Sequence, residues 1–319
     1  MNKNLPFRFF FYVSSFFMFI FSPHWFTIWV CLELNTLIVV RFIIKNKKEI
    51  ESALIYFLTQ RISSIAIIFF IFTRNRDNTL HTISIVSTVL VICFLYKIGA
   101  TPFSSWFISI SMNINTFIFF VMLTLQKIIP FMLFIFTTPA GMWEVVIVII
   151  LSLTLGSIIN FTASNLKIIL IFSRVSHRGW FLLALNMNTS LWVFYFFLYT
   201  VIIYSLINII PSNSKTNFLQ RKSTQITLIL SIITLAGLPP LVIFIPKVSL
   251  ISMRSSYSMY LTVLLLIFRS ILDFFIYLRI SYSLSLLHSC KIMFFKQKII
   301  NPLIIIIGRA ISTIRLRMF

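Results

Sequence analysis

The chain has 319 residues, of which 59% are hydrophobic and 10% charged, and its mean hydropathy is +1.02. Apolar runs such as 9–40, 62–73, 82–96 and 228–246 exclude a water-soluble protein. The net charge of +21 would suggest nucleic-acid binding in a soluble protein, but the basic residues gather between apolar runs and in the tail, so we expect no nucleic-acid partner. The composition predicts one polytopic, all-α integral membrane domain over 1–319.

About eleven transmembrane helices fit this length, because each span needs roughly 20 apolar residues. The segment 286–319 is basic, and its apolar piece at 299–307 is either a final short span or an interfacial helix. Basic residues at the start and in the 41–51 loop predict that the N-terminus lies on the inner, matrix-equivalent side. We expect helices at 7–22, 25–44, 52–73, 82–98, 104–116, 117–137, 142–160, 165–185, 190–211, 225–246 and 248–285, the last being long enough for two.

Glycine and proline interrupt two of these spans. The break at 99–102 follows Lys97, and the break at 237–240 precedes Lys247. Proline removes a backbone donor and clashes with the preceding turn, so we expect kinked or unwound helices there. Irregular backbone at membrane depth is tolerated only where protein or a water-lined cavity satisfies it, and broken helices commonly bracket ion sites. A break beside a lysine, found twice, therefore indicates a functional site.

Four ionisable residues lie inside the apolar runs: Glu33, Lys97, Lys127 and Lys247. A charge in hydrocarbon costs about 3 kcal/mol or more, so such residues indicate function. Loss of hydration destabilises the charged form of an amine, which allows a buried lysine to exchange a proton near neutral pH. Two charged amines about 10 Å apart at an effective dielectric of about 20 repel by ~1.7 kcal/mol, enough to bias a neighbour but too little to drive a proton uphill. The sequence predicts a proton relay.

Each relay residue has a competing structural interpretation. Glu33 could be a structural carboxylate bonded to a neighbouring helix, and Lys97 and Lys247 could snorkel from helix ends. Lys127 lies centrally in its apolar span and is hardest to explain in that way. His177 is a secondary candidate, either a hydrogen-bonding core residue or a relay member.

We expect structural roles for several other ionisable residues. Arg269 and Asp273 are four apart and should form an ion pair on one helix face. Glu49 and Glu51 should be solvated in a basic loop. The three cysteines and four histidines have no metal-ligand spacing, so we expect no metal or redox cofactor in the chain itself.

Seven segments, in order between about 25 and 286, resemble the subunit 2 family of mitochondrial NADH:ubiquinone oxidoreductase, respiratory complex I. They are WFTIWVCLELNTL, ESALIYFLTQ, LYKIGATPFSSWF, LQKIIP, SNLKIILIFSRVSHRGW, LAGLPPLVIFIPKVSLI and FIYLRISYS. The resemblance implies an antiporter-like membrane-arm subunit in the mitochondrial inner membrane. It implies flavin, iron–sulfur clusters and quinone in partner subunits, and contacts with other membrane-arm subunits and with anionic lipid such as cardiolipin.

In that family the acidic residue of the first segment pairs with the lysine of the third, which implies a pair between Glu33 and Lys97. The lysines of the fourth and sixth segments match Lys127 and Lys247. We therefore expect Glu33 to modulate Lys97, Lys127 to carry the proton midway, and Lys247 to deliver it outward. The alternative function is a stand-alone cation/proton antiporter, which would use similar intramembrane charges.

The chain departs from the family pattern at two kinds of position. Near the third segment, a histidine and a Pro-Glu pair are replaced by Ser104, Ile108 and Ser109. Arginines stand where small or apolar residues are usual, at Arg61, Arg174 and Arg178. Each arginine could face a cavity, pair with a neighbouring carboxylate or snorkel, and the sequence leaves these choices open.

Overall fold

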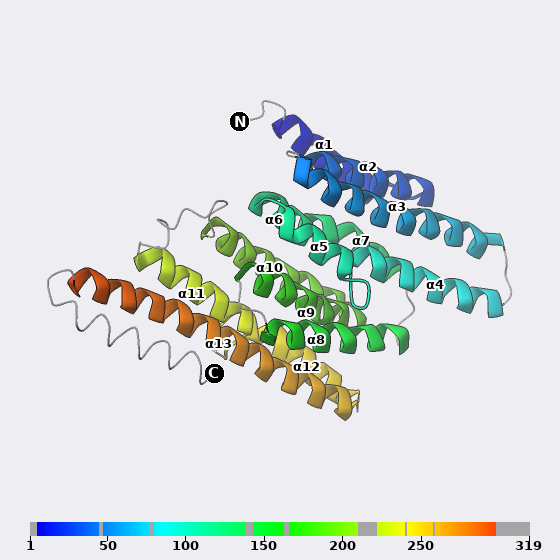
Figure 1. Cartoon of the computed structure of the whole chain (residues 1–319). Helices are drawn as coiled ribbons and strands as arrows, with labels where there is room; N and C mark the ends of the chain where they lie inside the picture. The colour runs from blue at the N-terminus through cyan, green and yellow to red at the C-terminus, as the bar shows by residue number, and fades with distance from the viewer. Residues whose placement is uncertain are drawn as a thin grey trace.

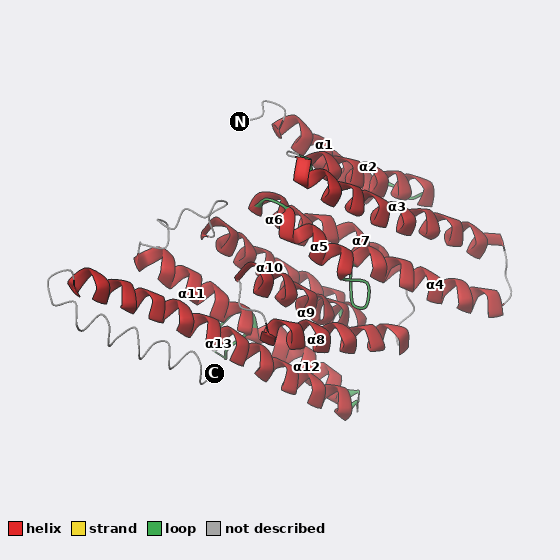
Figure 2. Cartoon of the chain, viewed as in Figure 1, coloured by secondary structure: helices red, strands yellow, loops and turns green. Residues whose placement is uncertain are grey.

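The structure, a computed structural model, describes residues 5–44, 47–76, 80–137, 143–162, 166–209, 222–239, 241–257 and 259–297. All regular elements in these ranges are α-helices (Figure 2). They are α1 (Leu5–Phe21), α2 (Trp25–Ile43), α3 (Lys47–Arg76), α4 (Leu80–Ile98), α5 (Ser105–Asn113), α6 (Thr116–Leu123), α7 (Leu125–Thr137), α8 (Trp143–Thr162), α9 (Leu166–Met187), α10 (Thr189–Ile209), α11 (Lys222–Ala236), α12 (Phe244–Ser256) and α13 (Tyr260–Gln297).

The helices lie side by side in one bundle that follows the order of the chain (Figure 1). Helices α1–α3 form one edge, α4–α7 follow, α8–α10 occupy the middle, and α11–α13 form the opposite edge. Among the described residues, 7 segments are long and apolar enough to cross a membrane, and three shorter apolar helices accompany them. Helices suit this environment because hydrocarbon offers no partners for backbone polar groups. The expectation of an all-α membrane protein with broken helices is confirmed.

The outer surface of the bundle is apolar, and its central helices are buried. Large apolar side chains such as Phe69, Phe197 and Leu261 are exposed, as lipid-facing residues would be. Helix α9 is the most enclosed span, with 94% of its apolar window buried, against 28% for α13 at the edge. Helix α9 is therefore surrounded by other helices, and its side chains contact several of them.

Polar and aromatic contacts join helices that are distant in sequence. Tyr12 donates to the Gln126 side-chain oxygen over 3.2 Å, and Gln126 donates to the Tyr56 hydroxyl over 2.6 Å. These bonds tie α1, α3 and α7 together. The Phe131 ring of α7 lies 6.1 Å from that of Phe181 of α9, centroid to centroid. Hydrogen bonds between membrane helices of this kind fix their relative positions.

Three expected helices prove to be divided. The helix expected at 117–137 consists of α6 and α7, which meet at Thr124, where φ is −112° and ψ is −82°. The helix expected at 225–246 ends at Ala236, and α12 begins at Phe244. The stretch 248–285 contains the rest of α12 and the start of α13, as its length allowed. Helix α13 continues to Gln297, beyond the expected boundary at 286, and the apolar piece at 299–307 lies outside the described residues.

One expectation about a charged residue is wrong. Glu49 is buried in the first turn of α3 and accepts a hydrogen bond from the Asn115 side chain over 3.4 Å. Helix α3 begins at Lys47, five residues before the expected start at 52, so Glu49 belongs to a packed helix. Its neighbour Glu51 is exposed, as expected.

Candidate functional site

Ionisable side chains from successive helices meet in the interior. The relay candidates are almost fully buried: Glu33 is 6% exposed, Lys97 2%, Lys127 4% and Lys247 3%. They come from α2, α4, α7 and α12, which lie in this order across the bundle (Figure 1). The lysine side chains therefore lie inside the protein and not on its surface. We call this row of residues the charge axis.

Glu33, at the α2 end of the axis, is held by helix α3. One carboxylate oxygen, Oε2, lies 2.6 Å from Arg61 Nη1, and the other accepts a hydrogen bond from the Ser64 hydroxyl. No ion pair joins Glu33 to Lys97 in the described part of the chain. Arg61 thus takes one of the roles that the sequence left open, pairing with a neighbouring carboxylate.

Lys97 lies at the broken end of α4. Gly99 has φ of 74°, its N–H reaches the carbonyl of Tyr96 over 3.1 Å, and the N–H of Ala100 reaches that of Leu95 over 3.0 Å. This is the Schellman arrangement, which needs a left-handed residue and so favours glycine. The Lys97 ammonium has no hydrogen-bond partner among the described residues, although Glu33 acts on it electrostatically.

Cations from other helices satisfy the carbonyl groups at the end of α4. Lys127 Nζ donates to the Lys97 carbonyl over 3.3 Å, and Arg178 Nη1 donates to the Gly99 carbonyl over 2.6 Å. Trp106 Nε1 donates to the Tyr96 carbonyl over 3.2 Å. The last carbonyls of a helix lack intrahelical partners and carry a partial negative charge, so buried cations are stabilised there.

Aromatic rings also contact these two cations. Lys127 Nζ lies 4.9 Å from the centroid of the Trp106 ring, and Arg178 Cζ lies 3.7 Å from that of Phe107. A Cβ atom at Gly99 would lie 3.0 Å from Arg178 Nη1. Glycine therefore serves both the left-handed turn and the close approach of a cation.

The same design recurs at Lys247. Gly237, with φ of 79°, ends α11, and Lys247 Nζ donates to the carbonyl of Ala236 over 3.0 Å. A Cβ atom at Gly237 would lie 3.2 Å from that nitrogen. The ammonium also lies 5.5 Å from the Trp180 ring centroid. Both expected helix breaks thus place a buried cation on a helix C-terminus.

Helices α9 and α10 contribute further buried polar residues, some of them close enough to Lys247 to interact with it electrostatically. His177 Nδ1 and the Tyr195 hydroxyl are hydrogen-bonded at 3.0 Å, and Arg174 Nη1 donates to the Tyr199 hydroxyl over 2.8 Å. All four are buried. His177 therefore has the hydrogen bond of a core residue, while Lys247 and Arg174 both act on it electrostatically.

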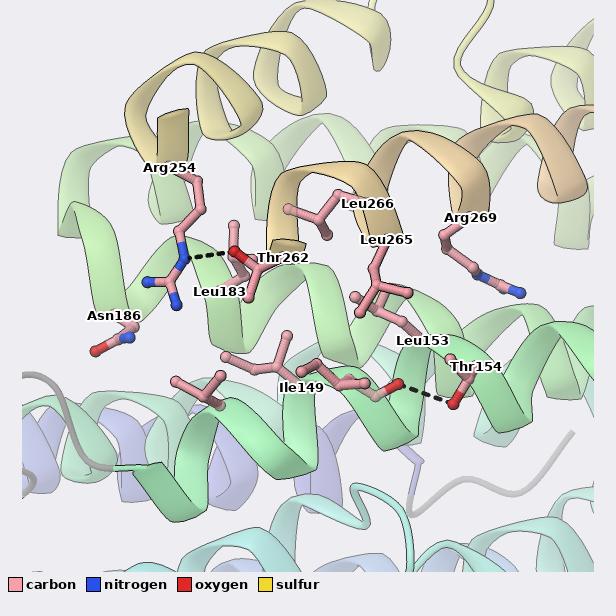
Figure 3. A pocket seen from close by; sticks show the side chains of 12 residues that line it. Ile149, Leu153, Thr154, Leu183, Asn186, Arg254, Thr262, Leu265, Leu266 and Arg269 are labelled. Atoms are coloured by element: carbon pink, nitrogen blue, oxygen red, sulfur yellow. Dashed lines mark hydrogen bonds between the residues drawn. The ribbon is translucent and has the colours of Figure 1, made fainter. Parts of the chain in front are cut away.

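Arg269 and Asp273 of α13 form the expected ion pair, with 2.6 Å between Arg269 Nη2 and Asp273 Oδ1. Both residues act electrostatically on Lys247. Arg269 also lines a small cavity of about 30 Å³ between α8, α9, α12 and α13 (Figure 3). Arg254, which donates to the Thr262 hydroxyl over 3.2 Å, lies with Asn186 at the other end of this pocket (Figure 3). The pocket links the ion pair to a partly polar region.

The axis carries more cations than carboxylates. Glu33 pairs with Arg61 and Asp273 with Arg269. The charges on Lys127 and Lys247 are therefore stabilised mainly by helix-end carbonyls and ring faces, which hold an ammonium less firmly than a carboxylate does. Such lysines are suited to exchanging protons, since arginine stays charged while a buried lysine does not.

Sequence reasoning located the buried lysines and two of the helix breaks but missed several partners. Trp106 lies within one of the quoted segments and caps the end of α4 beside Lys127. The break at Thr124, directly before the turn that carries Lys127, has no glycine or proline to mark it. Arg61 and Ser64 are three apart on α3, a spacing that puts them on one helix face, and this signal could have been read.

The fold and the charge axis define a polytopic membrane protein with ionisable groups in broken helices. The family model described as NADH:quinone oxidoreductase/Mrp antiporter, TM matches residues 22–273. The chain belongs to this family. It is 30% identical over 289 residues to "NADH-ubiquinone oxidoreductase chain 2" of Anopheles gambiae, covering 85% of this chain and 82% of the relative. The identically named protein of Didelphis virginiana is 30% identical over 280 residues, covering 83% and 81%.

Solved structures share the fold. A chain of respiratory complex I from Thermus thermophilus with bound aureothin superposes with a TM-score of 0.76 at 17% identity, covering 86% of this chain and 69% of that chain. A chain of the Mrp complex from Dietzia sp. DQ12-45-1b has the same TM-score at 15% identity, covering 86% and 59%. The fold alone therefore does not separate a complex I subunit from an antiporter subunit.

Proposed function

We propose that the chain is a core membrane-arm subunit of proton-translocating NADH:ubiquinone oxidoreductase and moves protons along the charge axis. Its contribution to the enzyme is translocation, while the flavin, iron–sulfur clusters and quinone that carry electrons belong to partner subunits. The names of the relatives at 30% identity favour this enzyme over the stand-alone antiporter, which the fold would equally allow.

The observation that carries the proposal is the repeated placement of a buried lysine on a broken helix end. In the proposed path, Glu33 sets the charge of Lys97, the proton passes to Lys127, and Lys247 delivers it toward the outer side. Lys127 already touches the backbone of Lys97, at 3.3 Å from its carbonyl oxygen. His177, on which Lys247 acts electrostatically, is a secondary relay candidate.

For the last step we propose the pocket beside Arg269 as the exit. Hydration of this pocket would connect the Arg269–Asp273 pair, and through it Lys247, with the region of Arg254 and Asn186. The pocket has leucines along its length and polar groups at its ends, so water that enters it would find hydrogen-bond partners at the ends (Figure 3).

The proposed location is the mitochondrial inner membrane, with the N-terminus on the matrix side. The proposed partners are the other membrane-arm subunits and anionic lipid such as cardiolipin. Basic residues of the segment 41–48 support the lipid contact, because basic clusters at the membrane surface attract anionic headgroups.

A pair of variants at Lys127 tests the proposal in the assembled enzyme. Lys127→Met removes the proton carrier, and Lys127→Arg keeps a cation that does not release its proton. Protons moved per NADH oxidised should fall in both variants, with enzyme content measured on native gels. Full stoichiometry in either assembled variant would refute the relay.

A further inference from the structure

The Glu33 carboxylate is cradled by a single helix, α3. Arg61 Nη1 lies 2.6 Å from one oxygen, and the Ser64 hydroxyl donates to the other. The guanidinium carbon of Arg61 lies 4.9 Å from the Phe57 ring centroid, one turn earlier on α3. Three residues at spacings of three and four thus form one face that receives the carboxylate.

A second contact fixes this face against α2. Trp29, one turn before Glu33, donates its indole N–H to the Ser64 carbonyl over 3.1 Å. Helices α2 and α3 are therefore also joined one turn before the carboxylate. The position of Glu33 against Arg61 follows from the packing of two helices.

The neighbouring Lys97 is left without a hydrogen-bond partner among the described residues, and its side chain is buried. Glu33 and Arg61 act on it electrostatically with opposite sign. A carboxylate paired with a guanidinium offers little net attraction to a third charge. To hold Lys97 strongly, Glu33 must leave the cradle.

The two side chains of the ion pair differ in how exposed they are. The Arg61 side chain is 29% exposed at the outer face of α3, whereas that of Glu33 is 8% exposed. The Glu33 side chain has rotatable bonds, so its carboxylate can take other positions by a change of rotamer. The Arg61 guanidinium attracts the carboxylate at all times, because arginine does not lose its charge.

We propose that Arg61 is a positioning residue that competes with Lys97 for the Glu33 carboxylate and so gates proton transfer from Lys97 to Lys127. With Glu33 on Arg61, the Lys97 ammonium gives its proton to the neutral amine of Lys127. With Glu33 on Lys97, the ammonium keeps that proton. The inference rests on the proposed relay and adds a regulator to it.

Variants of the cradle in the assembled enzyme test this gate. Arg61→Gln leaves Glu33 on Lys97 and should slow proton-coupled NADH oxidation about five- to tenfold per assembled enzyme. Arg61→Lys keeps the cation and should restore most of the rate. Arg279→Gln is the control, because Arg279 also lies over a phenylalanine ring, 5.4 Å from that of Phe161, but on α13. It should leave the rate unchanged.

A double variant separates positioning from a merely structural effect. If Arg61 acts through Glu33, then Arg61→Gln combined with Glu33→Gln should be no slower than Glu33→Gln alone. If Arg61→Gln does not assemble, Ser64→Ala loosens the cradle while keeping every charge, and it should slow turnover about two- to threefold.

The outcomes distinguish this inference from the function on which it rests. A wild-type rate in Arg61→Gln, or losses that simply multiply in the double variant, would overturn the gate. If Arg61→Gln does not assemble and Ser64→Ala is tested in its place, a wild-type rate in Ser64→Ala would also overturn the gate. If Lys127→Met still pumps fully, the relay itself fails, whatever Arg61 does.

Discussion

The Lys127 ammonium donates a hydrogen bond to the backbone carbonyl of Lys97 over 3.3 Å. That carbonyl belongs to the last turn of α4, which ends at Ile98, directly before the left-handed Gly99, and leaves it without an intrahelical partner. A charged donor holds such a carbonyl about twice as strongly as a neutral one. The protonation state of Lys127 therefore affects how firmly α7 is bound to the end of α4.

Replacing Gly237 should disturb the Lys247 site. Gly237→Ala puts a side chain on a residue with φ of +79° and a Cβ atom 3.2 Å from Lys247 Nζ. We expect the free energy of unfolding to fall by about 1–2 kcal/mol and proton pumping to decrease. Thermal denaturation of the purified enzyme and proton uptake by vesicles measure the two effects.

Ser231→Ala serves as the control on the same helix. The Ser231 hydroxyl donates to the Leu228 carbonyl within α11, so its loss breaks a hydrogen bond inside one helix. Equal behaviour of the two variants would show that the left-handed turn at Gly237 does not matter for Lys247.

The burial of Glu49 predicts an effect on stability without one on transport. Glu49→Ala leaves the Asn115 side chain without this partner and should cost about 1–3 kcal/mol, read from thermal denaturation. Glu51→Ala, at an exposed position on the same helix, should change stability by less than about 0.5 kcal/mol. Pumping per assembled enzyme should stay normal in both. A Glu49→Ala enzyme as stable as the Glu51→Ala enzyme would contradict the assignment.

The sequence predicted those parts of the site that depend on local signals. The breaks at Gly99 and Gly237 follow from glycine and proline, whose effects act within a few residues. Burial of Lys127 follows from its central place in an apolar run. The ion pair of Arg269 and Asp273 follows from helical spacing alone.

Features that depend on how helices face one another were beyond the sequence. Arg61 and Ser64 share a helix face, but the rotation of α3 against α2 decides that this face meets Glu33. The break at Thr124 has no breaker residue and arises in the packed bundle. Glu49 was misread because its neighbours in sequence are basic, whereas its structural neighbour is Asn115.

Filling the pocket should slow proton release if it is the exit. Leu265 lines the pocket, while its neighbour Leu264 is 67% exposed and does not line it. Leu265→Phe should reduce proton-coupled turnover about threefold or more, because the larger ring displaces water from the route. Leu264→Phe adds the same volume toward the lipid and should have little effect. Proton uptake by vesicles at matched enzyme content compares them, and equal rates would rule out this exit.

The Arg269–Asp273 pair offers a test of whether it acts on Lys247 or only holds α13 in place. Asp273→Asn leaves a buried arginine uncompensated and should lower the free energy of unfolding by about 3–5 kcal/mol. Replacing both residues, as Arg269→Met with Asp273→Leu, removes both charges and should recover most of that stability.

Proton pumping then separates the two roles, because Asp273 attracts the Lys247 ammonium while Arg269 repels it. If the pair is part of the charge axis, the double variant should assemble and unfold like wild type yet pump poorly. Normal pumping in that variant would limit the pair to a structural role and would end the charge axis at Lys247.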